Sequence, residues 1–164
     1  MLPFYLQMMG LNAVRTDPEL PSVDDLWPEL VPAGRSVDLL DAKWLLNVGA
    51  WRPVVMGAWF SLRFSTAEIG VELRRAMERS LGSLTAPPLA TACVLVAGVE
   101  SLPELEHYVR TDPGDDGSAQ FVAAAMEHLG ALPPTPVSDG AYRERVQEML
   151  TLGIRLLHDM SARD

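Results

Sequence analysis

The sequence contains a single cysteine, Cys93, among 164 residues. One thiol cannot form an internal disulfide, which excludes the disulfide-rich scaffolds of small secreted domains. The longest apolar run, Leu89–Val99, is much shorter than the roughly 20 residues that a membrane-spanning helix needs. Residues 1–14 carry neither a cationic leader nor a small-residue cleavage site. We therefore expect a cytoplasmic protein that does not cross a membrane.

Basic residues are scarce as well. Lys and Arg number 13 against 22 Asp and Glu, so the formal net charge is −9. Such a charge repels nucleic acid at long range and favours a basic partner. The charge is uneven: residues 1–47 sum to −4, residues 48–82 to +2 and residues 83–164 to −7. We expect a protein partner and no nucleic acid.

Strand-like alternation of apolar and polar residues is also missing, which predicts an all-α fold. With 48% apolar residues, a chain of this length can bury a core without metals or disulfides. We predict one domain over residues 1–164. Residues 1–35 form an irregular, proline-rich segment packed on it, with short helices near 3–12 and 23–30. Residues 36–164 form helical repeats.

Capping signals place the helices that follow. Ser36 is suited to cap a helix that Gly49 ends. The next helix is predicted over 50–64. Ser65 and Glu68 then have the spacing of a capping box, in which each side chain bonds the other residue's backbone N–H.

The helical pattern recurs with a shift of 36 residues. This shift aligns Ser65 and Glu68 with Ser101 and Glu104, and it aligns the apolar positions that follow them. A helical hairpin repeating at this period is typical of HEAT-like α-solenoids.

A third unit is predicted from helices over 119–129 and 138–160, separated by a proline-rich turn. We therefore predict HEAT-like α-α hairpins stacked in a short solenoid or a compact right-handed bundle.

Motifs for chemistry are lacking. The histidines lie on three different predicted helices, and Glu104 with His107 forms a Glu-x-x-His spacing that has no second copy. No phosphate-binding glycine loop or nucleophile elbow is present. Cys93 lies in an apolar stretch, where burial raises a thiol pKa and blocks access. We expect no metal, no cofactor and no enzymatic activity.

One candidate binding surface is acidic. Glu104, Asp112, Asp115 and Asp116 fall near one turn between predicted helices, where carboxylates could meet a basic partner. The alternative is a solvated loop with capping aspartates.

A second candidate surface is a stripe on the helix predicted over 50–64. Arg52, Trp59 and Arg63 share one face, and an exposed tryptophan between arginines has the composition of an interface hot spot. The alternative is a buried Trp59, with the arginines paired to Glu68 or Glu72.

Short stretches between residues 48 and 130 resemble an uncharacterised bacterial family of helical-repeat proteins associated with toxin immunity. They comprise Trp51-Arg52, Gly57-Ala58-Trp59, Ile69-Gly70, Leu105–Tyr108, and Asp115, Asp116, Gln120, Ala123 and Leu129. The last segment departs from the family pattern, because it lacks the expected tyrosine and tryptophan. The resemblance implies a cytoplasmic inhibitor that masks a toxin domain, and the charge suits a basic toxin.

The sequence as a whole favours a protein-binding module, an acidic immunity factor or an adaptor. A self-associating helical scaffold is one alternative, and concentration-dependent light scattering would favour it. A carboxylate-dependent enzyme is the other, and it requires a deep pocket with two or more pKa-shifted carboxylates.

Overall fold

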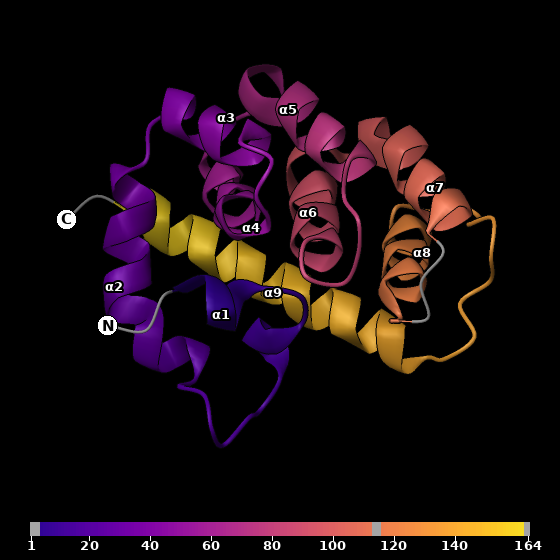
Figure 1. The fold of residues 1–164 in the computed structure, drawn as a ribbon, viewed down its shortest axis with the longest axis horizontal. Coiled ribbons are helices and arrows are strands. Elements are labelled where there is room, and N and C mark those ends of the chain that lie inside the picture. The colour runs from indigo at the N-terminus through magenta and orange to yellow at the C-terminus, as the bar shows by residue number, and fades with distance from the viewer. Residues whose placement is uncertain (1–3, 113–115, 163–164) are drawn as a thin grey trace.

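The computed structural model describes residues 4–112 and 116–162, and within these ranges it is all-helical without a strand (Figure 1). The prediction of an all-α fold is confirmed. The α-helices are α1 (Phe4–Met8), α2 (Val23–Ser36), α3 (Leu39–Asn47), α4 (Trp51–Phe60), α5 (Thr66–Glu78), α6 (Ala86–Ala92), α7 (Leu102–Thr111), α8 (Ser118–His128) and α9 (Ala141–Ser161). Short 3₁₀ helices lie at Asn12–Val14, Ser61–Arg63 and Gly98–Ser101, and a π-helix at Cys93–Ala97 extends α6.

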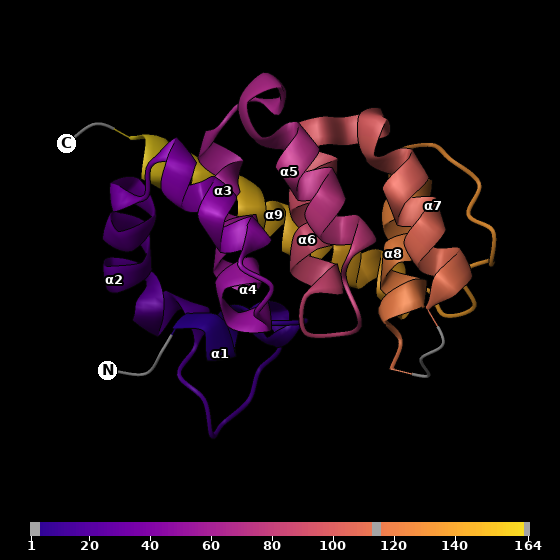
Figure 2. The ribbon, with the colours of Figure 1, turned by 45° about the horizontal axis from the view of Figure 1, so that its top comes forward.

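The helices from α3 to α8 form two layers. In the outer layer α3 packs on α5 and α5 on α7, while in the inner layer α4 packs on α6 and α6 on α8 (Figures 1 and 2). The connections α3–α4, α5–α6 and α7–α8 therefore run from the outer to the inner layer. The α3–α4 and α5–α6 connections lie along one edge of the layers, at the bottom of Figure 2.

The last helix does not continue this series as a third repeat. Instead of following α7 in the outer layer, α9 runs across the inner layer, where it packs on α8, α6 and α2 (Figure 1). Its buried positions recur at helical spacing and include Val146, Met149, Gly153 and Leu156. This apolar stripe explains the arrangement, because the inner helices expose an apolar side that only another helix can cover.

The N-terminal segment is more helical than predicted. Helix α2 is capped by Ser22, which forms a capping box with Asp25, and it continues from Val23 through two prolines to Ser36. Ser36 therefore ends a helix and does not cap the next one. Asp38 has that role, since its side chain accepts a hydrogen bond of 2.8 Å from the Asp41 N–H.

The two predicted capping boxes have different outcomes. Glu68 accepts a hydrogen bond of 2.9 Å from the Ser65 N–H, and the box at the start of α5 is confirmed. The box at Ser101 is wrong. The Ser101 hydroxyl donates to the Gly98 carbonyl oxygen at 2.6 Å and does not cap α7. A 3₁₀ helix leads directly into α7, so α7 has no free N-terminus for Ser101 to cap.

One helical stretch, Ala86–Thr111, is long and apolar enough by composition to cross a membrane. Its most apolar window has a mean hydropathy of 1.3, and 56% of that window is buried inside the protein. A core helix has the same properties, and here the stretch comprises α6, the π-helix and α7, which lie in both layers.

The contact between α3 and α4 depends on a glycine. A Cβ atom at Gly57 would lie 3.0 Å from both the Leu45 Cβ and the Leu46 backbone nitrogen. Backbone atoms cannot move aside as a flexible side chain can, so the two helices approach this closely only because position 57 has no side chain.

We predict that Gly57→Ala destabilises the protein. Alanine in a helix interior is favoured over glycine by about 1 kcal/mol, but overpacking costs about 1–3 kcal/mol. We expect a net loss of about 1 kcal/mol in the free energy of unfolding by urea. Gly140→Ala is the matched control, because Gly140 has helical dihedral angles and a Cβ atom added there would meet no atom within 4 Å. Equal stabilities of the two variants would contradict this explanation of the crossing.

Candidate functional site

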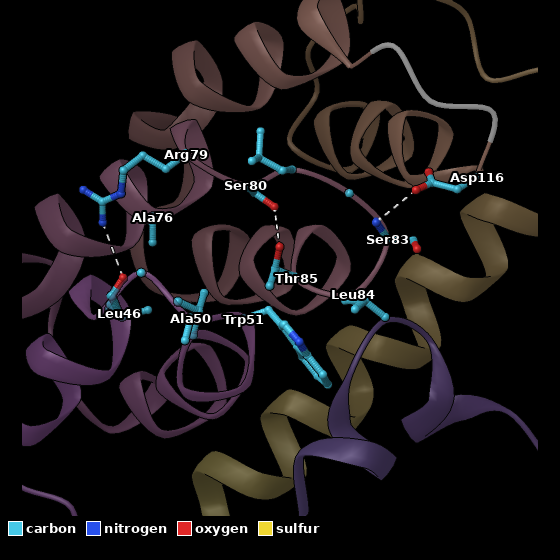
Figure 3. Close-up of a pocket in the computed structure, with 14 residues that line it drawn as sticks. Leu46, Ala50, Trp51, Ala76, Arg79, Ser80, Ser83, Leu84, Thr85 and Asp116 are labelled. Atoms are coloured by element: carbon cyan, nitrogen blue, oxygen red, sulfur yellow. Dashed lines mark hydrogen bonds between the residues drawn. The ribbon is translucent and has the colours of Figure 1, made fainter.

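A pocket lies at the edge where the α3–α4 and α5–α6 connections meet (Figure 3). Its volume is about 600 Å³, within the range of roughly 300–1,000 Å³ that is typical of binding sites. The residues that line it are Leu46, Gly49, Ala50, Trp51, Val54, Ala76, Arg79, Ser80, Leu81, Gly82, Ser83, Leu84, Thr85 and Asp116. We call it the edge pocket. Most of its wall is apolar, and its charged groups lie at opposite ends.

The loop from Arg79 to Thr85 forms one wall of the edge pocket. Its ends are joined by a hydrogen bond of 2.7 Å between the hydroxyl groups of Ser80 and Thr85. Gly82, with φ of +143°, adopts a backbone conformation that other residues rarely reach. The resulting tight loop turns Leu81 outward, where its side chain is 97% exposed.

The opposite wall is Trp51, at the first turn of α4. Its ring meets the Tyr5 ring of α1 edge-on, with centroids 5.5 Å apart. The Arg52 guanidinium lies 4.6 Å from the Trp51 ring and 5.2 Å from the Tyr5 ring, both within cation–π distance. The N-terminal segment thus holds this wall in place.

Arg79 occupies one end of the edge pocket. Its guanidinium donates to the Asn47 side-chain oxygen at 3.0 Å and to the Leu46 carbonyl oxygen at 3.4 Å. No carboxylate among the described residues pairs with it. Its positive charge therefore faces the solvent at the pocket mouth without an ionic partner.

Asp116 occupies the other end, between the edge pocket and a smaller one of about 210 Å³. Its carboxylate accepts hydrogen bonds from the Ser83 N–H, the Ser118 N–H and the Ser118 hydroxyl, at 3.1, 3.0 and 2.6 Å. Partial burial raises the pKa of Asp116, but the hydrogen bonds from Ser118 and Ser83 outweigh it, and the net pKa is lowered. Asp116 is therefore an ionised group that joins two loops.

This arrangement lacks the parts of an acid–base site. Asp116 is the one carboxylate among the residues that line the edge pocket, and its lowered pKa makes it a poor proton donor. Cys93 is buried, and burial raises the pKa of its thiol to about 12, with a further contribution from Glu104. Within the described residues, no three His, Cys, Asp or Glu side chains are grouped to hold a metal ion.

The prediction of an exposed Trp59 is wrong. Only 1% of Trp59 is exposed, and its indole N–H donates to the Met8 carbonyl oxygen at 2.9 Å. The packing of α1 on α4 covers this position, which helical periodicity alone did not reveal.

Arg63 and Arg52, predicted beside Trp59, have different roles. Arg63 donates to the carbonyl oxygens of Gly34, Arg35 and Val37 at 2.7, 2.8 and 3.1 Å. It thereby satisfies the C-terminus of α2 and pairs with neither Glu68 nor Glu72. Arg52 is exposed and lies beside the edge pocket.

The predicted acidic surface is brought together only in part. Asp112 and Asp116 both contact the Ser118 hydroxyl, at 3.2 and 2.6 Å. Glu104 lies at the other end of α7, where it pairs with Arg74 at 3.6 Å. Asp115 lies outside the described residues.

Sequence reasoning missed Arg79 and the leucines of the Arg79–Thr85 loop. One signal was available, since Arg79 and Leu81 lie within residues 48–82, the one of the three segments with a net positive charge. That the Arg79–Thr85 loop lies beside Asp116 could not be predicted, because no local sequence pattern reports contacts between distant loops.

No protein-family model, curated protein or solved structure matches this chain. Its function is consequently inferred from the geometry of the edge pocket and its surroundings.

We predict that Asp116→Asn reduces stability at neutral pH and has little effect in acid. A carboxyl with a lowered pKa in the folded state stabilises the fold above its unfolded pKa of about 3.9. That contribution disappears as the pH falls through the lower folded pKa. Urea midpoints of wild type and variant should therefore differ at about pH 7 and converge near pH 2.5.

Glu29→Gln is the control for this comparison, because Glu29 is exposed on α2. Its urea midpoint should follow that of the wild type throughout. A difference between Asp116→Asn and wild type that persists undiminished in acid would contradict the assigned role of Asp116.

Proposed function

We propose that this protein is a binding module for another protein, and that the edge pocket is its binding site. One observation carries the proposal: an open, mostly apolar pocket has exposed leucines at its rim. Leu81 is 97% exposed and Leu84 is 39% exposed. Apolar side chains that stay exposed together around a pocket indicate a site of interaction with another molecule. The lack of a second carboxylate in the pocket lining argues against acid–base chemistry there.

A HEAT-like architecture is part of the proposal. The two-layer arrangement of α3 to α8 supports it, as does the spacing of α5 and α7, which begin 36 residues apart at Thr66 and Leu102. In helical-repeat proteins the connections between helices commonly contribute to binding. The edge pocket lies between two such connections.

Acting as an immunity factor, an inhibitor or an adaptor, the protein would bind stoichiometrically and without turnover in the cytoplasm. The resemblance to toxin-immunity proteins supports inhibition. The net charge of −9 would speed the encounter with a basic toxin domain.

A self-associating scaffold is the second candidate, and one observation favours it. Leu40, Trp44 and Val48 follow one another at helical spacing on α3, and they are 76%, 60% and 38% exposed. Light scattering of the isolated protein tests this candidate. A mass that rises with concentration would support it, whereas a constant monomer mass would exclude it.

We predict that Leu81→Ala weakens capture of the partner from a lysate of the native host, as measured by quantitative mass spectrometry. Leu81 has few internal contacts to lose, so the effect should appear in binding and not in the melting temperature.

Leu132→Ala is the matched control, since Leu132 is 94% exposed and lies in the α8–α9 connection, outside the edge pocket. This variant should capture the partner as well as the wild type does. If the two variants retain the same partner equally, the edge pocket is not the binding site.

A further inference from the structure

Three arginines around the edge pocket lack acidic partners. They are Arg79 at the pocket end, Arg75 one helical turn before it on α5, and Arg52 beside Trp51. All three are exposed, and none forms an ion pair with a carboxylate in the described part of the chain. They are unpaired although acidic residues outnumber basic ones by 22 to 13.

Five other arginines do have such partners. Arg74 pairs with Glu104, Arg143 with Glu127 and Arg155 with Asp24, at 3.6, 2.6 and 2.6 Å. Arg110 and Arg145 likewise pair with glutamates on their own helices. Arg15 and Arg63 also have no carboxylate partner among the described residues, but Arg63 donates to three backbone carbonyl oxygens and Arg15 lines the smaller pocket. Three of the arginines without a carboxylate partner therefore lie around the edge pocket, in a protein whose net charge is negative.

The one carboxylate of the pocket does not cancel this charge. Asp116 lies at the far end from Arg79 (Figure 3), and its oxygens already accept three hydrogen bonds from Ser83 and Ser118. A cationic group entering near Arg79 would meet like charge and no free acceptor there. A carboxylate would meet unpaired guanidinium groups, which bind carboxylates through paired N–H donors.

Between these charges the wall is apolar. Leu46, Trp51, Val54 and Ala76 line this pocket, and Leu84 lines both this pocket and the smaller one. An occupant must therefore combine a large apolar side chain with acidic groups next to it.

We propose that the edge pocket binds a linear peptide segment in which a large apolar side chain is flanked by aspartate or glutamate. The apolar side chain packs against Trp51 and Val54, and the carboxylates pair with Arg79 and Arg52. This inference rests on the proposed protein-binding function and specifies the partner segment. The pocket would thus prefer an acidic segment, whereas the net charge of the whole chain favours a basic partner.

The test is selection from a random 12-residue peptide library displayed on phage, with the full-length protein immobilised. The enriched peptides should contain a leucine, phenylalanine or tryptophan within four positions of an acidic residue. Fluorescein-labelled synthetic copies of these peptides then serve as probes for affinity, measured by fluorescence anisotropy. Their affinity should fall as NaCl is added, because salt screens the ion pairs.

Arg79→Glu should weaken binding of these probes by about tenfold, which corresponds to the loss of roughly 1.4 kcal/mol. Arg110→Glu is the control, since it changes the net charge by the same amount at a site on α7 where Arg110 pairs only with Glu106. Arg52→Glu provides an independent second variant that leaves the Arg79 hydrogen bonds to Asn47 and Leu46 intact.

Enriched peptides rich in lysine or arginine, or no enrichment at all, would overturn the proposal. So would equal losses of affinity in Arg79→Glu and Arg110→Glu. These outcomes are separable from failure of the protein-binding function: capture of a host protein that depends on Leu81 would still hold if the selected peptides were basic.

Discussion

The burial of α9 against the inner layer is the constraint on which the rest of the structure depends. The inner helices α4, α6 and α8 span only 7–11 residues each, too few to bury an apolar side without a neighbour. The 21-residue α9 packs on α6, on α8 and on the 3₁₀ helix Ser61–Arg63 that follows α4, and it also packs on α2. The Leu95 side chain packs directly on Gly153 of α9, since a Cβ atom at Gly153 would lie only 2.6 Å from Leu95 Cδ1.

This burial decides which surfaces remain for binding. The inner layer already contacts α9 through α6 and α8, so this face of the two layers is covered. The edge formed by the α3–α4 and α5–α6 connections is not covered by α9, and it contains the edge pocket together with arginines that have no carboxylate partner among the described residues. The net charge of −9 therefore sets the long-range electrostatic potential of the molecule, whereas Arg52 and Arg79 supply positive charge close to the pocket.

Sequence reasoning predicted what local signals control. The all-α class, the Ser65–Glu68 capping box and the helix end near Gly49 follow from propensities and caps that act over a few residues. The box at Ser101 was wrong because a 3₁₀ turn, which capping rules do not foresee, precedes α7.

Features that depend on tertiary packing were not predictable in this way. Periodicity placed Trp59 on a face of α4, but only the docking of α1 determines that this face is buried. The edge pocket likewise joins Leu46, Leu84 and Asp116, which lie far apart in the sequence. Residue spacing within a single helix cannot predict that residues from such distant parts of the chain line one pocket.

The central claim, that a protein partner occupies the edge pocket, is tested most directly by site-specific photocrosslinking in the native host. Benzoylphenylalanine replaces either Ala50, which lines the pocket, or Ala67, which is exposed on α5 outside the pocket. Binding at the edge pocket predicts one discrete crosslinked protein from position 50 and none of that mass from position 67. The same crosslinked protein from both positions, or from position 67 alone, would contradict it.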